Sequence, residues 1–137
     1  MGFGPYYSKN MHSNAMMYSF AATNHRAVNE LTEMQLRLNG SFAEDGSVHA
    51  SVISMGAAYL PLTGDITPVF GANFGFGYAS GKQIKLSGGF SGSAQVGVRF
   101  FRTAQNQMEL SGRYESVFKG NDLGFPAIYG IQLAVLL

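Results

Sequence analysis

Hydrophobic and polar residues alternate along most of this chain with a period of two, the pattern of β-strands. In the stretch 88–101, one face carries aromatic and aliphatic side chains, and the other carries Ser, Gln, Gly and a single Arg. The polar face lacks the Lys, Glu and Thr side chains that coat a soluble sheet. Small polar groups on one face and large apolar groups on the other are typical of the wall of a narrow membrane barrel.

The same alternation predicts eight strands, at residues 2–8, 14–24, 30–42, 46–61, 70–78, 88–101, 106–119 and 127–137. Pro5 weakens the first strand because proline cannot donate a ladder hydrogen bond. The alternation slips near residues 53–55, where a β-bulge is expected, and Val48, Ala50 and Val52 are assigned to the lipid side. Because bacterial barrels have an even strand number of at least eight, the prediction is an all-β, eight-stranded antiparallel up-and-down transmembrane β-barrel, a single domain over 1–137.

Two turns support this arrangement. The polar turn 102–106 joins the predicted strands 88–101 and 106–119. Pairing across it sets Arg99 beside Glu109 and Gln95 beside Arg113. That register satisfies both faces at once. The segment 43–46 is predicted to form a tight turn in which Gly46 adopts positive φ.

Composition narrows the class of protein. Charged residues make up 12% of the 137 residues, about half of the usual globular share. The net charge of +1 gives no support to nucleic-acid binding, and the absence of cysteine excludes disulfides and thiolate sites. No apolar run reaches the ~18 residues of a membrane helix. No signal peptide is recognisable, so an exported protein is expected to be present in its mature form.

A soluble barrel would also alternate, so the decision depends on side-chain size and charge. A lumen of eight strands has room for small side chains, whereas the phenylalanines of the apolar face would overfill it. The polar face carries three acids and three arginines, a set that can pair as a lumenal salt-bridge network: Glu33, Arg37, Arg99, Glu109, Arg113 and Glu115. With both termini periplasmic, the connections near 9–13, 43–46, 80–87 and 120–126 face outward, and all four lysines lie on that side. Candidate surface contacts, for lipopolysaccharide phosphates or a protein partner, are Lys82, Ile84, Lys85 and Lys119; an ordinary solvated loop is at least as good an interpretation.

The C-terminal segment 128–137 combines Gly130 with apolar Leu133 and Val135 and an apolar last residue, Leu137. In this it resembles the assembly signal of the small bacterial outer-membrane barrels of the OmpA and OmpX class. It departs by ending in Leu where that family favours Phe, and by an Ile at 128 where a polar residue is usual. The resemblance implies an integral protein of the Gram-negative outer membrane, surrounded by lipid and lipopolysaccharide and inserted by the barrel assembly machinery.

Enzymatic motifs are weak. His49 and Ser51 share one face of a strand and resemble part of the site of outer-membrane lipid A deacylases, but no acid lies on the following strand to orient the His. The competing interpretation places His49 beside Asn39 near the outer rim, in polar contacts. The three histidines fall in separate regions, which makes a metal site improbable, and no cofactor motif is present.

The expected function is therefore that of a non-enzymatic outer-membrane barrel with a plugged polar lumen, in a structural role or contacting surface partners through short loops. Two alternatives remain open at this point. One is a small pore, with a water path past the lumenal side chains. The other is a soluble lipocalin-like carrier, in which the apolar face turns inward around a ligand.

Overall fold

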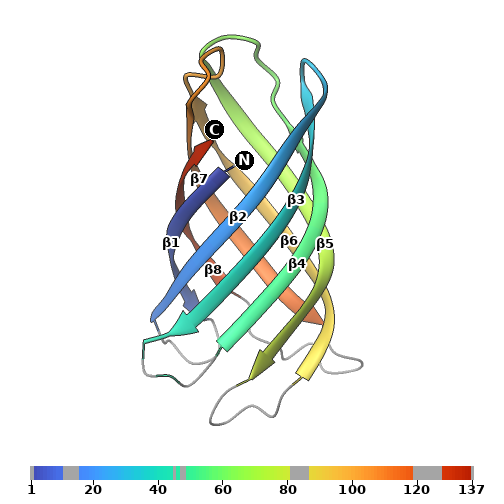
Figure 1. Ribbon diagram of the computed structural model, residues 1–137, viewed down its shortest axis with the longest axis vertical. Helices are drawn as coiled ribbons and strands as arrows, with labels where there is room; N and C mark the ends of the chain where they lie inside the picture. Colours follow the sequence, from blue (N-terminus) through green and yellow to red (C-terminus); the bar gives the residue numbers. More distant parts are fainter. Residues whose placement is uncertain are drawn as a thin grey trace.

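The computed structural model describes residues 2–10, 16–44, 46, 49–80, 87–118 and 128–136, and its strands close into one barrel (Figure 1). Each strand pairs with its neighbours in chain order, which is the predicted up-and-down meander. The strands are β1 (Gly2–Asn10), β2 (Met16–Asn29), β3 (Thr32–Ala43), β4 (His49–Tyr59), β5 (Ile66–Ser80), β6 (Ser87–Phe100), β7 (Gln107–Phe118) and β8 (Ile128–Leu136). The described part of the chain contains no helix long and apolar enough to cross a membrane.

The barrel closes between the first and last strands. β1 pairs antiparallel with β8 from Gly2 opposite Leu136 to Asn10 opposite Ile128. Pro5 faces Phe20 on β2, whereas the β8 register leaves it without a partner. This position suits a residue without an N–H, because the ladder is maintained on both sides of it. The short segment that seemed weakest in the sequence is therefore the strand that closes the sheet.

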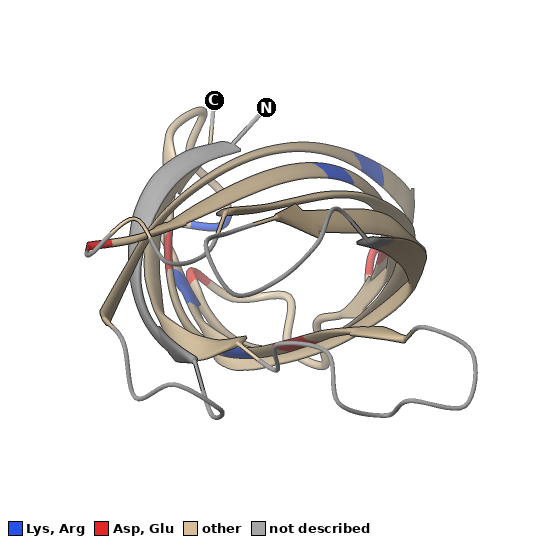
Figure 2. Ribbon diagram, turned by 90° about the horizontal axis from the view of Figure 1, so that it is seen from below, with Lys and Arg blue, Asp and Glu red and all other residues tan. Residues whose placement is uncertain are grey.

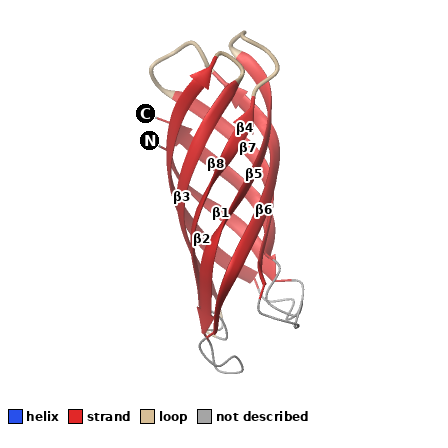
Figure 3. Ribbon diagram, turned by 90° about the vertical axis from the view of Figure 1, so that its right-hand side faces the viewer, coloured by secondary structure: helices blue, strands red, loops and turns tan. Residues whose placement is uncertain are grey.

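The two ends of the barrel differ. At one end, which we call the turn end, short connections join β2 to β3, β4 to β5 and β6 to β7 (Figures 1 and 3). The opposite, loop end carries the connections that follow Asn10, Ala43, Ser80 and Phe118. Of the loop-end residues that are described, Gly46 has φ of 67°, as predicted for this turn, and its N–H donates to the carbonyl of Ala43 at 3.0 Å.

Burial alternates along the strands and gives the barrel opposite inner and outer surfaces. Large apolar side chains cover the outside, where Phe74 and Phe90 are each 67% exposed. The inside holds charged and amide side chains, including Arg99 at 1% exposure and Glu109 at 4%. A lipocalin-like carrier requires the reverse arrangement, so the structure contradicts that alternative. Such an apolar exterior is stable only in lipid.

The prediction for 46–61 is wrong in its assignment of faces. The described strand runs from His49 to Tyr59, and its register with β3 and with β5 shows no shift, so there is no bulge near 53–55. Ala50 and Val52 point inward and are buried, while Ile53 and Met55 face outward. Val48 lies outside the described residues. The inner face of this strand carries small apolar residues, so its sequence pattern resembles that of a lipid-facing surface. The described register shift of β2 and β3 lies between Ala27 and Asn29, and β2 extends five residues beyond its predicted end at 24.

Inward-facing glycines allow the narrow curvature of the wall. A Cβ added to Gly75 would collide with the backbone carbonyl of Ile53, and one added to Gly97 would collide with that of Leu110. These contacts are with neighbouring strands, whose backbones cannot give way without breaking the ladder. Glycine at these positions therefore lets adjacent strands bend around a small lumen.

Candidate functional site

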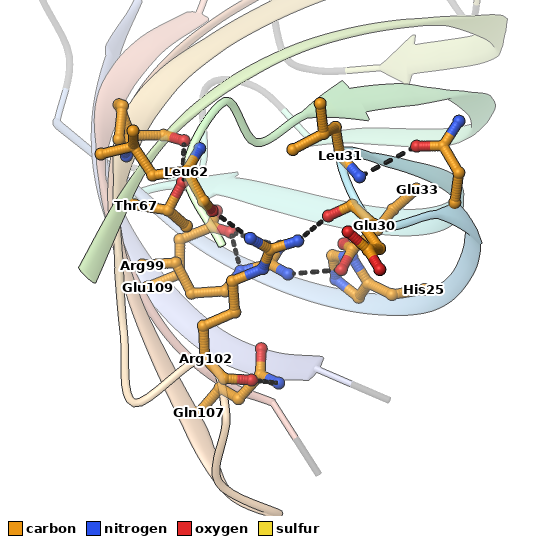
Figure 4. Close-up of polar contacts among 12 residues, drawn as sticks. His25, Glu30, Leu31, Glu33, Leu62, Thr67, Arg99, Arg102, Gln107 and Glu109 are labelled. Carbon is orange, nitrogen blue, oxygen red and sulfur yellow. Dashed lines mark hydrogen bonds and ion pairs between the residues drawn. The ribbon is translucent and has the colours of Figure 1, made fainter. Parts of the chain in front are cut away.

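The lumen is the best-defined chemical environment of the described chain, and Arg99 is its centre near the turn end. The Arg99 guanidinium donates to Oε1 of Glu33 at 2.7 Å and to Oε2 of Glu109 at 3.0 and 3.3 Å. Nδ1 of His25 lies 3.3 Å from the second oxygen of Glu33. β2, β3, β6 and β7 each contribute one of these four side chains, so the cluster joins strands on both sides of the lumen (Figure 4). Acidic and basic positions occur on both sides of the barrel wall (Figure 2).

A second group continues this network toward the loop end. Gln95 donates to Glu109 at 3.0 Å and accepts from Arg113 at 3.1 Å, so it links the two layers. Nε of Arg113 lies 3.5 Å from Oε2 of Glu115, which also accepts from Asn39 at 2.9 Å. The predicted partners of the hairpin, Arg99 with Glu109 and Gln95 with Arg113, are confirmed as register neighbours. Each buried charge in these layers therefore has an oppositely charged or amide partner, as burial requires.

Arg37 is the sixth charged residue of the predicted network and lies on β3. It donates to Gln132 of β8 at 2.9 Å and is 3% exposed. Beside it, a small polar cavity of about 10 Å³ is lined by Gln35, Gln132 and Glu109, which leaves room for about one water molecule. The two amide atoms of buried Gln35 have no hydrogen-bond partner among the described residues, and a water in this cavity would satisfy them.

The loop end of the lumen is filled by apolar side chains, which the sequence analysis did not anticipate. The buried cluster there comprises Met17, Ala21, Ala43, Ala50, Val52, Ala79, Val117 and Ile128. It explains the unusual Ile128 of the C-terminal segment, because this residue points inward and is only 5% exposed. The expectation of a polar lumen is therefore correct for the middle of the barrel and wrong for its loop end.

At the turn end, Arg102 connects the three turns (Figure 4). Its guanidinium donates to the backbone carbonyls of Leu62, in the β4–β5 turn, and Glu30, in the β2–β3 turn. Thr103 beside it donates to Asp65. Below these contacts, Leu60 is fully buried with Ala58 and Val69. Turns far apart in sequence are thus held together across this mouth of the barrel, a role that a lone Arg in a turn sequence does not reveal.

His49 and Ser51 lie outside the lumen. Both belong to the outward face of β4, where His49 is opposite Phe42 and Ser51 is opposite Gly40. The rings of Phe42 and His49 meet edge to face, with centroids 5.5 Å apart. The expectation that His49 contacts Asn39 is wrong, because Asn39 opposes Val52 and points into the lumen. On the next strand the partners of His49 and Ser51 are Ser80 and Tyr78, so neither faces a carboxylate there.

Other predicted positions are described only in part. Lys82, Ile84, Lys85, Lys119 and Leu137 lie outside the described residues. In β8, Leu133 and Val135 face outward, and Gly130 lies on the inward face opposite Arg113. Strand β8 thus carries an outward apolar stripe and an inward glycine beside a bulky lumenal arginine.

The network also contains amide and imidazole side chains that the predicted set of six charged residues does not include. Gln95, Gln132 and Asn39 each hydrogen-bond a charged member of the network, and His25 joins it at the turn end. The alternation along each strand places these residues on its inward face, and this is the signal in the sequence that could have identified them. Sequence did not reveal which amide would reach which charge, because these contacts join residues separated by up to 95 positions.

Comparison with solved structures places this architecture among small membrane barrels. Neisserial surface protein A is similar with a TM-score of 0.74 and 13% identity, over 98% of this chain and 90% of that one. The outer membrane enzyme PagL gives 0.69 and 12%, over 98% and 97%. The N-terminal β-barrel domain of Pseudomonas aeruginosa OprF gives 0.62 and 12%, over 98% and 94%. No protein-family model and no curated protein sequence matches the chain.

The fold is that of an outer-membrane β-barrel. At these identities the likeness establishes architecture alone, and the neighbours include both an enzyme and a surface protein. The chemistry of this chain therefore has to be argued from its own lumen, wall and ends.

Proposed function

We propose that this chain is a non-enzymatic integral barrel of the bacterial outer membrane, with a closed lumen and a structural or surface-contact role. The observation that carries the proposal is the filling of the lumen at three levels. Arg102 joins the turns at one mouth, the Arg99 and Arg113 layers occupy the middle, and the Met17 cluster fills the other mouth. A barrel filled in this way serves as a rigid wall element rather than as a channel.

Conductance tests the closed lumen directly. The protein, refolded in detergent and inserted in a planar bilayer, is expected to remain silent at high voltage, while a porin reconstituted by the same procedure conducts. Ions would have to pass the paired side chains of Arg99 and Glu109, which are nearly inaccessible to solvent. Reproducible stepwise conductance of the wild-type protein would overturn this part of the proposal and support the pore.

The non-enzymatic assignment is supported by the surroundings of His49 and Ser51. A Ser–His pair becomes an effective nucleophile when a third group orients the His, and the described partners across β3 and β5 are Phe42, Gly40, Ser80 and Tyr78. We expect identical lipid A profiles in cells expressing wild-type protein, His49→Ala protein or an empty vector. A change produced by the wild type and abolished in His49→Ala would establish the deacylase instead.

Assembly through β8 can be separated from folding itself. The side chains of Leu133 and Val135 lie on the outer wall, away from the lumenal network, and are 50% and 43% exposed in the folded barrel. We expect Leu133→Gln with Val135→Gln to lower the outer-membrane fraction in cells while still refolding in detergent in vitro. Equal loss in both settings would show that these residues serve stability only.

The surface-contact role remains a proposal on sequence grounds, since the lysines concerned lie outside the described residues. Replacing Lys82, Lys85 and Lys119 with Gln is expected to weaken binding of lipopolysaccharide to the refolded barrel, whereas replacing them with Arg keeps the charge and the binding. Equal binding by both sets of variants would contradict the role of these cations. The two sets differ in charge and little in size, so they control for each other.

A further inference from the structure

The outer wall of the barrel contains an apolar groove of about 720 Å³ across β2, β3, β4 and β5. Its floor contains the small residues Ala22, Gly40 and Ser51, and aromatic side chains border it, Phe20 on one side and Phe76 and Tyr78 on the other. The volume lies within the range of about 300–1,000 Å³ that is usual for small-molecule sites.

The strand register explains the shape of the groove. Phe20 lies opposite Gly40, Gly40 opposite Ser51, and Ser51 opposite Tyr78, so one row across four strands reads large, small, small, large. With neighbouring strands about 4.8 Å apart, the two aromatic residues stand roughly 14 Å from each other. A Cβ at Gly40 would meet only the ring of Phe42, at 3.7 Å, so the hollow is open above the glycine.

Ser51 gives the groove a chemical preference. Its side chain faces outward, and the described residues include no hydrogen-bond partner for its hydroxyl. A hydroxyl in hydrocarbon without an acceptor is costly. Ser51 lies two residues, or about 7 Å, from the loop-end start of β4 at His49. This distance is similar to the thickness of the interfacial layer that separates the hydrocarbon core from water. The groove thus offers an apolar trough with one hydrogen-bond donor near its interfacial end.

We propose that this groove binds one acyl chain of lipopolysaccharide, with an ester, amide or chain hydroxyl oxygen accepting a hydrogen bond from Ser51. The assignment to lipopolysaccharide rests on the proposed function and on the orientation predicted from the sequence, in which the loop end, where Ser51 lies, faces the outer leaflet. The aromatic borders and the small floor hold the chain in a fixed position, unlike the exchanging lipid around the rest of the wall. A second copy of the barrel is the competing occupant.

Native mass spectrometry of the detergent-refolded barrel tests the assignment, with deep-rough lipopolysaccharide and phosphatidylethanolamine supplied as separate probes. The wild type is expected to retain one lipopolysaccharide molecule and no stoichiometric phosphatidylethanolamine. Gly40→Leu fills the floor and is expected to lower retention at least tenfold. The matched control is Gly112→Leu, because Gly112 faces outward on β7 and a Cβ there meets only the Val96 carbonyl oxygen, at 3.8 Å. Ser51→Ala is expected to lower retention about three- to tenfold, the value of one net hydrogen bond.

Each contrary result has a definite meaning. Equal retention by Gly40→Leu and wild type, stoichiometric phosphatidylethanolamine alone, or a protein dimer that Gly40→Leu dissociates would each overturn the inference. Heat-modified migration in SDS, run on the same samples, verifies that every variant is a folded barrel. Absence of bound lipopolysaccharide from the folded, detergent-requiring wild-type barrel would refute the groove assignment alone, whereas good solubility without detergent would refute the membrane barrel itself.

Discussion

Arg99 is the lumenal charge whose removal should destabilise the barrel most. The side chain is 1% exposed and makes three hydrogen bonds to two carboxylates. In Arg99→Met a similar volume is retained, but Glu33 and Glu109 are left buried beside each other without their shared cation. Both the lost bonds and the repulsion between the two acids act against folding.

The magnitude follows from these contacts. Three charge-assisted bonds at about 1.5–3 kcal/mol each would sum to more than 4 kcal/mol, but such terms are not additive within one network. Glu33 also retains 16% side-chain exposure and can regain some hydration. We therefore expect a loss of about 3–5 kcal/mol in the free energy of unfolding, the usual cost of breaking a buried ion pair from one side.

Urea unfolding of the barrel in lipid vesicles, followed by far-ultraviolet circular dichroism and by the heat-modified band in SDS, measures this loss. Arg26→Met is the matched control, because Arg26 is exposed on β2 and should change stability by less than about 0.5 kcal/mol. Combining Arg99→Met with Glu33→Gln and Glu109→Gln removes the unpaired charge and should recover most of the loss. A cost below about 1 kcal/mol for Arg99→Met, or no recovery in the triple variant, would refute the reasoning.

Three further predictions concern the wall and its ends. Gly75→Val should prevent refolding to the heat-modified form because the new side chain meets a neighbouring backbone, whereas Gly64→Val, with nothing within 4 Å of its Cβ position, should refold normally. Arg102→Ala should accelerate amide hydrogen exchange in the turns that Arg102 connects, with little change in the strands. Equal exchange in variant and wild type would show that Arg102 does not hold these turns together. Phe74→Arg, on the lipid face, should cost about 2–4 kcal/mol in vesicle unfolding, and a smaller cost would place this face away from the hydrocarbon.

Local pattern was informative wherever the two faces of a strand differed sharply. The alternation in 88–101 and 106–119 determined their inner and outer faces, and the turn between them determined the register that sets Arg99 against Glu109. The same reasoning failed over 46–61, where the inner residues Ala50 and Val52 are apolar. Period-two patterns report a difference between faces and do not say which face is inside when both are apolar.

What the sequence by itself determined is the strand succession, the outward apolar stripe, the balanced set of lumenal charges and hence the class of fold. Only the tertiary structure decided that β1 closes the barrel against β8, that Met17 and Ile128 belong to one buried apolar cluster, and that Arg102 reaches two distant turns. The groove between Phe20 and Tyr78 belongs to the same category. Alternation along a strand is local and can be read from neighbouring residues. Contacts across a lumen and rows across a wall join residues far apart in the chain, and they arise from strand register and barrel closure together.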